Sequence, residues 1–160
     1  MINIDKSYVY KIEDFEFKDG IFQLLQKLQK LNYQLFIITN QSGIARGYYS
    51  KEDFLTLSSW MLQEFQKQKI FIKKLYYCPH SPDSNCKCRK PKTGMLDQAN
   101  KEFGVDIKNS WLIGDKESDI EAGHNFGIEN TIFLSSNYQN RNSARYSVDT
   151  IFDIIDLINY

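Results

Sequence analysis

The sequence predicts an α/β fold in which a mainly parallel sheet carries helices on both faces. Three observations support this prediction. Apolar runs of strand length alternate with amphipathic stretches of helical period, polar residues follow the apolar runs directly, and 160 residues suit one domain with one core. We therefore expect residues 1–160 to form a single domain, with its functional side chains beyond the carboxyl ends of the strands.

The expected strands and helices alternate along the chain. Strands are predicted at 33–40, 70–78, 110–115 and 130–135, and helices at 20–32, 50–65, 93–104 and 117–127. Residues 147–160 should form a short strand or turn followed by a helix, and the polar segment 135–147 is expected to be a solvated loop.

Local signals support the helix boundaries. Ser50 and Asp53 have the spacing of a capping box, Thr93 is the expected cap of the helix at 93–104, and Gly104 is its expected end. In the first helix, apolar residues recur on one face at helical spacing: Ile21, Leu24, Leu25, Leu28 and Leu31.

Charge and composition restrict the classes of partner. Twenty basic residues balance 20 acidic ones, so a nucleic-acid or membrane-surface partner is not expected. No apolar stretch approaches the ~20 residues of a membrane span, and no signal-peptide pattern is visible. We expect a cytoplasmic protein, and a monomer, because no apolar stripe is left over for an interface.

The strongest local signal is the stretch CPHSPDSNCKC, residues 78–88, which contains all three cysteines of the chain. Three thiolates and one imidazole would form a closed tetrahedral Zn²⁺ site with no open position for water or substrate. Such a zinc ion is structural and would stabilise a polar loop. The alternative is three free cysteines beside a loop histidine. The predicted ligands are Cys78, His80, Cys86 and Cys88.

Arg89 and Lys90 follow the last cysteine and lead through Pro91 towards a helix N-terminus. Two cations beside the positive end of a helix dipole suit an anion, for which phosphate is the obvious candidate. The alternative is a basic pair that is simply solvated.

Polar residues also follow two of the predicted strands. Thr39, Asn40, Gln41 and Ser42 end the strand at 33–40, where a hydroxyl and turn N–H groups could bind phosphoryl oxygens or merely cap a turn.

Asp115 ends the strand at 110–115, where its carboxylate could bind Mg²⁺ or cap the next helix. The neighbouring Lys116 could pair with that acid or reach a substrate phosphate. His124 is expected to be a surface residue of the following helix rather than a catalytic base.

Together and in this order, these motifs resemble the haloacid-dehalogenase (HAD) superfamily of phosphohydrolases. The segments TNQSGIARG (39–47), CRKP (88–91) and GDKESD (114–119) are similar to its second, third and fourth motifs. Within it, the zinc loop and YYCPH, CRKPKTGML and GDK resemble the D-glycero-D-manno-heptose 1,7-bisphosphate phosphatases. The sister histidinol-phosphate phosphatases share the zinc loop but typically have TNQDGLGT in place of TNQSGIARG.

The resemblance implies a Rossmann-like HAD fold and a Mg²⁺-dependent phosphatase that works through an aspartyl-phosphate. Its substrate would be the C7 phosphate of a heptose 1,7-bisphosphate, in ADP- or GDP-heptose and lipopolysaccharide synthesis. Thr39 and Lys90 would stabilise the phosphoryl group, and Asp115 would bind Mg²⁺. The implied substrate-binding residues are Asp5, Lys6, Ser7, Tyr8, Thr39, Asn40, Gln41, Ser42, Arg89, Lys90 and Lys116.

One departure from the family pattern affects the expected activity. The nucleophile and the general acid lie in a D-x-D-G-[TV] motif that immediately precedes the equivalent of Ile2-Asn3, so both aspartates would precede Met1. We expect the central strand to be absent as well, and the printed chain to be inactive. A start codon that encodes valine in that motif would explain Met1.

Two alternative functions remain. The substrate could be histidinol phosphate or another small phosphate ester. The chain could instead be a non-catalytic, zinc-stabilised domain that binds a sugar phosphate or a protein partner. The missing aspartates favour the second alternative, whereas Thr39, Lys90 and Asp115 favour an enzyme.

Overall fold

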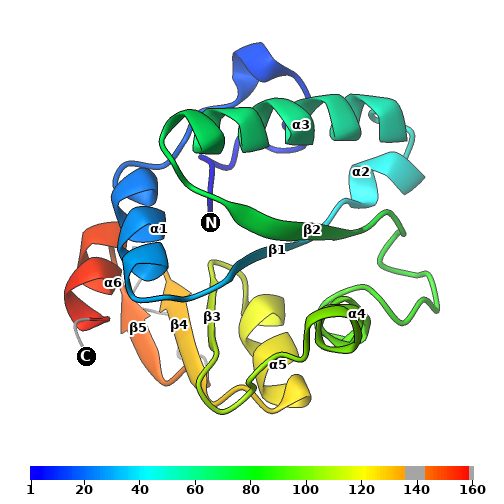
Figure 1. The fold of residues 1–160 in the computed structure, drawn as a ribbon. Helices are drawn as coiled ribbons and strands as arrows, with labels where there is room; N and C mark the ends of the chain where they lie inside the picture. The colour runs from blue at the N-terminus through cyan, green and yellow to red at the C-terminus, as the bar shows by residue number, and fades with distance from the viewer. Residues whose placement is uncertain (136–142, 159–160) are drawn as a thin grey trace. The chain divides into compact units, whose positions relative to one another are not determined.

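The computed structural model describes residues 1–135 and 143–158, which fall into two compact units (Figure 1). The first unit is Ile2–Ser84, and the second is Asn85–Tyr160 together with Met1. Residues 136–142 of the predicted loop at 135–147 lie outside the described residues, and its last two residues, Tyr146 and Ser147, belong to strand β5 instead of a loop. Both units combine parallel strands with helices, so the predicted α/β fold class is confirmed.

The first unit consists of two parallel strands and four helical segments. The sheet pairs β1 (Leu35–Asn40) with β2 (Ile72–Cys78), and its register places Thr39 beside Tyr77. The helical segments are the 3-10 helix η1 (Ile12–Asp14), α1 (Ile21–Lys30), α2 (Ser42–Ala45) and α3 (Lys51–Lys67).

Helix α3 lies along the β1–β2 pair (Figure 1). The ring centroids of Phe54 in α3 and Tyr77 in β2 are 4.7 Å apart. The helix begins as predicted: Ser50 Oγ accepts a hydrogen bond from the Asp53 N–H, and the Asp53 carboxylate accepts one from the Ser50 N–H. The core of this unit includes Ile21, Leu24 and Phe65, which have no solvent exposure.

The first residues of the chain form an antiparallel bridge between Asn3 and Phe17. Two backbone hydrogen bonds extend it, from the Ile4 N–H to the Glu16 carbonyl and from the Lys18 N–H to the Ile2 carbonyl. The sequence does not predict this bridge. It fixes the start of the segment that contains Asp5 to Tyr8.

The described residues of the second unit form three parallel strands in the order β3 (Trp111–Gly114), β4 (Asn130–Leu134) and β5 (Tyr146–Val148). Helix α5 (Glu117–Phe126) packs against β3 and β4, and α6 (Ile151–Leu157) packs against β5. The core of this unit includes Ile120 of α5, Ile132 of β4 and Ile154 of α6, which are fully buried. The unit also contains α4 (Gly94–Phe103).

The helix ends follow the predictions with one correction. Gly104 and Gly127 end α4 and α5 in the left-handed conformation that glycine adopts readily. Thr93 is the N-cap residue of α4, but its hydroxyl donates to Asp97 Oδ2 instead of accepting from the backbone. The Thr93 side chain therefore bonds to Asp97, one turn along α4, and does not cap the helix backbone.

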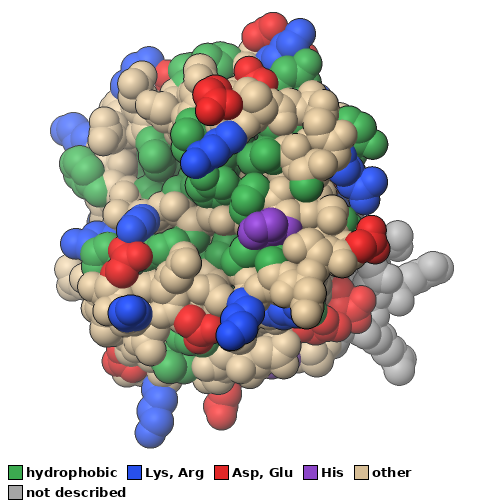
Figure 2. Space-filling view, turned by 90° about the vertical axis from the view of Figure 1, so that its right-hand side faces the viewer, with side chains coloured by type: hydrophobic (Ala, Val, Ile, Leu, Met, Phe, Trp, Pro, Cys, Tyr) green, Lys and Arg blue, Asp and Glu red, His purple; other side chains and the backbone are tan. Residues whose placement is uncertain are grey.

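The described strands form two sheets, β1–β2 in the first unit and β3–β4–β5 in the second. None of the helices at residues 1–135 and 143–158 combines the length and apolar character that a bilayer crossing requires. Acidic and basic side chains are interspersed on the face that Figure 2 shows, in keeping with the balanced composition.

Candidate active site

The four predicted zinc ligands lie together in the loop that follows β2. One ligand atom from each of Cys78, His80, Cys86 and Cys88 lies within 4.8 Å of the other three, and Cys78 Sγ is 3.5 Å from His80 Nδ1. With metal–sulfur bonds of about 2.3 Å and metal–nitrogen bonds of about 2.0 Å, tetrahedral ligand atoms are up to about 4 Å apart. A small inward movement of the four ligand atoms would therefore bring them to the spacing of a tetrahedral site. The cluster can thus hold a metal ion.

Two contacts within the second unit fix the chain after the last cysteine. The Gly94 N–H donates to the Lys87 carbonyl over 3.0 Å, and Lys92 Nζ donates to the Cys86 carbonyl over 2.7 Å. These bonds tie the start of α4 to the metal loop. The short segment between them carries Arg89 and Lys90.

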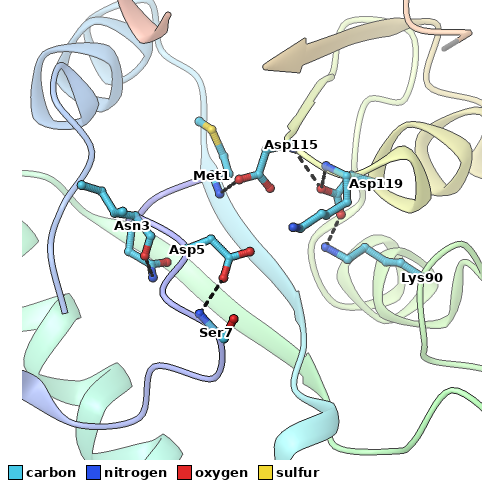
Figure 3. Close-up of polar contacts among 9 residues, drawn as sticks. Met1, Asn3, Asp5, Ser7, Lys90, Asp115 and Asp119 are labelled. Atoms are coloured by element: carbon cyan, nitrogen blue, oxygen red, sulfur yellow. Dashed lines mark hydrogen bonds and ion pairs between the residues drawn. The ribbon is translucent and has the colours of Figure 1, made fainter. Parts of the chain in front are cut away.

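Asp115 lies directly after β3, as predicted, and its side chain is 18% exposed. The Met1 ammonium forms an ion pair with its Oδ2 atom (Figure 3). The assignment of Asp115 as a magnesium ligand stays a prediction. The alternative that Asp115 caps the next helix is wrong, because the N-cap residue of α5 is Lys116.

Asp119, in the first turn of α5, organises this end of the sheet. Its Oδ2 atom accepts hydrogen bonds from the backbone N–H groups of Asp115 and Lys116, at 3.2 and 3.1 Å. Its Oδ1 atom forms an ion pair with Lys90 Nζ over 2.6 Å, in which both side chains are only 10% exposed (Figure 3). One carboxylate thus fixes the backbone that carries Asp115 and the side chain of Lys90.

The close packing of Asp119 requires a glycine at position 114, directly before Asp115. A Cβ atom at Gly114 would lie 2.3 Å from Asp119 Cβ and 2.6 Å from its Oδ2 atom. Any other residue at this position would therefore displace Asp119, whose Oδ2 atom accepts hydrogen bonds from the Asp115 and Lys116 N–H groups.

Thr39 and Gln41 lie where β1 ends and the short helix α2 begins. The Gln41 N–H donates to the Cys78 carbonyl at the end of β2 over 2.7 Å, and its side-chain Nε2 donates to Thr39 Oγ1 over 2.9 Å. Asn40 and Ser42 occupy the neighbouring positions of this turn. The Thr39 hydroxyl thus lies at the strand end, whereas the Gln41 N–H is bonded to the Cys78 carbonyl, and the phosphoryl-binding role of this turn stays a prediction.

The segment Asp5–Tyr8 forms an exposed turn in the same unit. The Ser7 N–H donates to Asp5 Oδ1 over 3.0 Å (Figure 3). Ser7 and Tyr8 have positive φ angles of 58° and 54°. Lys6 pairs with Glu16 over 3.1 Å. The ring of Tyr8 packs edge-on against Tyr48, with centroids 4.7 Å apart, which ties this turn to the chain that follows α2.

Arg89 and Lys116 complete the predicted set. Arg89 Nη1 is buried and has no hydrogen-bond partner within the described residues, whereas Lys116 is exposed. His124, which the sequence predicts to be a surface residue, is exposed and contacts Thr131 Oγ1 through its Nε2 atom.

Comparisons with known proteins establish the family. The chain is 58% identical over 135 residues to D-glycero-alpha-D-manno-heptose-1,7-bisphosphate 7-phosphatase of Campylobacter jejuni, a match that covers 84% of this chain and 77% of the relative. It is 43% identical over 159 residues to the beta-anomer phosphatase of Helicobacter pylori, covering 99% of this chain and 92% of the relative. The chain belongs to the heptose-1,7-bisphosphate 7-phosphatase family.

Two further matches agree with this assignment. Residues 87–156 match the model of the HAD-hydrolase-like family. The fold is similar to that of D,D-heptose 1,7-bisphosphate phosphatase from B. bronchiseptica, solved with magnesium and phosphate, with a TM-score of 0.85. That structure covers 98% of this chain at 20% identity, and 92% of its own length is matched. The resemblance that the motifs indicate is therefore confirmed.

At the candidate site, sequence reasoning missed two side-chain contacts of this heptose-phosphatase chain. The Lys90–Asp119 ion pair joins residues that are far apart in the sequence, although Asp119 stands one helical turn after Asp115. A hydrogen bond of 2.6 Å from the Tyr49 hydroxyl to Gln41 Oε1 had no local signal.

Proposed function

We propose that this chain carries the substrate-binding and phosphoryl-stabilising residues of a phosphatase that removes the C7 phosphate from D-glycero-D-manno-heptose 1,7-bisphosphate. The observation that carries the proposal is the 43% identity to the Helicobacter pylori phosphatase over nearly the full length of both chains. The product would be a heptose 1-phosphate for nucleotide-heptose and surface-glycan synthesis. We further propose that the protein acts as a cytoplasmic monomer.

The residues at the strand ends suit phosphoryl transfer. A hydroxyl at Thr39 and an ammonium at Lys90 can donate hydrogen bonds to the oxygens of the transferring group. Mg²⁺ bound at Asp115 would neutralise negative charge on a phosphoryl group. Asp119 supports this arrangement because it orients both Lys90 and the Asp115 backbone.

Arg89 provides the strongest structural support for an anionic substrate. A buried guanidinium N–H without a hydrogen-bond partner is costly, and a phosphate is the ligand whose geometry best matches it. We assign Arg89 to substrate recognition, together with Lys116 and the turn at Asp5 to Tyr8.

The nucleophile and the general acid of the proposed reaction are two aspartates in an Asp-x-Asp-Gly sequence, which is not among the printed residues. The first would attack phosphorus, and the second would protonate the sugar oxygen that leaves and then activate water. This division of roles makes the proposal testable with two chains.

The first chain is the printed one, and the second carries in addition an N-terminal strand segment that ends in Asp-x-Asp-Gly. With Mg²⁺ and either anomer of the heptose bisphosphate, we expect phosphate release from the extended chain only. An extension with Asn-x-Asn-Gly is the matched control and should be inactive. Phosphate release by the printed chain, or faster release from histidinol phosphate, would contradict the proposal.

The anomer needs its own comparison, because relatives of this chain are named for both. The Campylobacter jejuni relative is named for the alpha anomer and the Helicobacter pylori relative for the beta anomer. We propose the alpha anomer, since identity to that relative is higher. The ratio of kcat/KM for the two anomers tests this choice.

A further inference from the structure

A chain of hydrogen bonds runs from a buried tyrosine to Thr39 within the first unit. The Tyr49 hydroxyl donates to Gln41 Oε1 over 2.6 Å, and Gln41 Nε2 donates to Thr39 Oγ1 over 2.9 Å. We propose that Tyr49 is a positioning residue, which sets the orientation of the Gln41 amide so that Thr39 must donate its hydroxyl hydrogen to the phosphoryl group. This inference rests on the proposed function.

The argument starts from the two orientations of a carboxamide. As observed, the amide nitrogen faces Thr39, so the Thr39 oxygen accepts and its hydrogen remains available. In the flipped orientation, Gln41 Oε1 would accept the hydrogen of the Thr39 hydroxyl. That hydroxyl would then have no hydrogen to donate to a phosphate. The orientation of one amide therefore decides whether Thr39 can donate to an anion.

Tyr49 favours the observed orientation. Burial raises the pKa of its hydroxyl, and the nearby Tyr8 raises it further, whereas the Gly43 N–H near the phenol oxygen lowers it. The phenol therefore keeps its hydrogen at neutral pH. That hydrogen is donated to Gln41 Oε1, which lies 2.6 Å from the phenol oxygen.

The position of the Tyr49 ring is closely determined. The side chain is only 7% exposed, and the Tyr10 ring stacks on it at a centroid distance of 5.6 Å. A Cβ atom at Gly43 would lie 2.1 Å from Tyr49 Cε1, so the absence of a side chain there makes room for the ring. The Gln41 backbone is fixed as well, through its N–H bond to the Cys78 carbonyl.

Two measurements on the printed chain test the inference. The first is the pattern of nuclear Overhauser effects from the Gln41 carboxamide hydrogens, which should reach the Thr39 methyl group in the parent chain. In Tyr49→Phe, which removes only the hydroxyl, this pattern should weaken as the flipped orientation becomes populated. Carboxamide hydrogens that face the Tyr49 ring in the parent chain would overturn the inference.

The second measurement is a double-mutant cycle with inorganic phosphate and Mg²⁺ as the probe. Tyr49→Phe should weaken phosphate binding about three- to tenfold, the scale of one neutral hydrogen bond. Thr39→Val removes the proposed donor, so in that background Tyr49→Phe should have no further effect. Tyr10→Phe removes a neighbouring phenol hydroxyl outside the hydrogen-bond chain and should leave binding unchanged.

The outcomes separate this inference from the proposed function. An equal loss from Tyr49→Phe in both backgrounds would mean that Tyr49 acts only on the fold and would overturn the inference. If the parent chain binds no phosphate while the amide faces Thr39, the proposed function fails, and with it the phosphoryl role given to Thr39.

Discussion

Two ion pairs of this chain have the same nitrogen–oxygen distance but very different surroundings. Lys90 and Asp119 are 2.6 Å apart and each 10% exposed, whereas Lys67 and Glu64 are also 2.6 Å apart but 66% and 26% exposed. Water screens the second pair and competes for its partners. At the scale of single residues, burial rather than distance should therefore decide what each pair contributes.

We predict that Asp119→Ala lowers the free energy of unfolding by about 3–5 kcal/mol, because it removes the carboxylate of a buried ion pair and keeps the Lys90 charge. Glu64→Ala, the matched control, should cost less than about 1 kcal/mol. Urea denaturation of the two variants measures both values. Equal losses would show that the Lys90–Asp119 pair is solvated in solution.

These residue-scale contacts also mark where sequence reasoning ends. Strand-end positions could be predicted for Thr39 and Asp115, since a polar residue after a buried apolar run is visible in the sequence. The partners of Lys90 and Gln41 could not, because no periodic pattern relates a side chain to a group on another element.

At the scale of elements, helix starts were predictable where the cap is local. The reciprocal bonds between Ser50 and Asp53 follow from spacing alone, and a second capping box joins Thr150 and Asp153 at the start of α6. The helices η1 and α2 were missed because neither is long enough to show an apolar period.

We predict that Ser50→Ala lowers the free energy of unfolding by about 1 kcal/mol, because the Asp53 N–H loses its acceptor. Ser59, an exposed residue in the interior of the same helix, is the matched control. Ser59→Ala should be neutral or slightly stabilising, because alanine has the higher helix propensity. Thermal unfolding of both variants decides between a cap effect and a general effect of losing a serine.

The same capping box predicts an acid-sensitive contribution to stability. Hydrogen bonds from the Ser50 backbone and then from its hydroxyl lower the pKa of Asp53 below its ordinary value of 3.8. A lowered folded-state pKa stabilises the fold above the ordinary value, and that contribution is lost as the pH falls through the folded-state pKa.

We therefore expect Asp53→Asn to be less stable than the parent chain near pH 6, and the difference to shrink below about pH 3.8. Chemical denaturation across this range measures it. Glu52→Gln changes a neighbouring acid of the same turn and should show a smaller pH dependence. A difference that stays constant down to the lowest pH would mean that the cap does not depend on the Asp53 charge.

At the scale of the whole molecule, the α/β class and the metal loop were predictable because both depend on short-range patterns. Strand runs alternate with helical stripes, and the four metal-binding residues lie within 78–88. The bridge between Asn3 and Phe17 was not predictable, because such pairing depends on how distant segments pack. Whether residues 1–160 act as one domain stays a prediction.

The two histidines of the chain allow a matched test of the metal loop. His80 lies in the cluster with the three cysteines, whereas His124 lies on α5 and contacts Thr131. We predict that the purified chain contains one equivalent of zinc. His80→Ala should lose most of that zinc, since three thiolates leave the tetrahedral set incomplete, and His124→Ala should retain it.

Zinc removal should also lower stability, because the binding free energy of a structural zinc is available only to the folded loop. A chelator should therefore lower the Tm of the parent chain and of His124→Ala, and have much less effect on His80→Ala. Elemental analysis gives the zinc content and a thermal scan gives the Tm. Full zinc retention by His80→Ala, or a parent Tm that the chelator does not change, would contradict a structural metal in this loop.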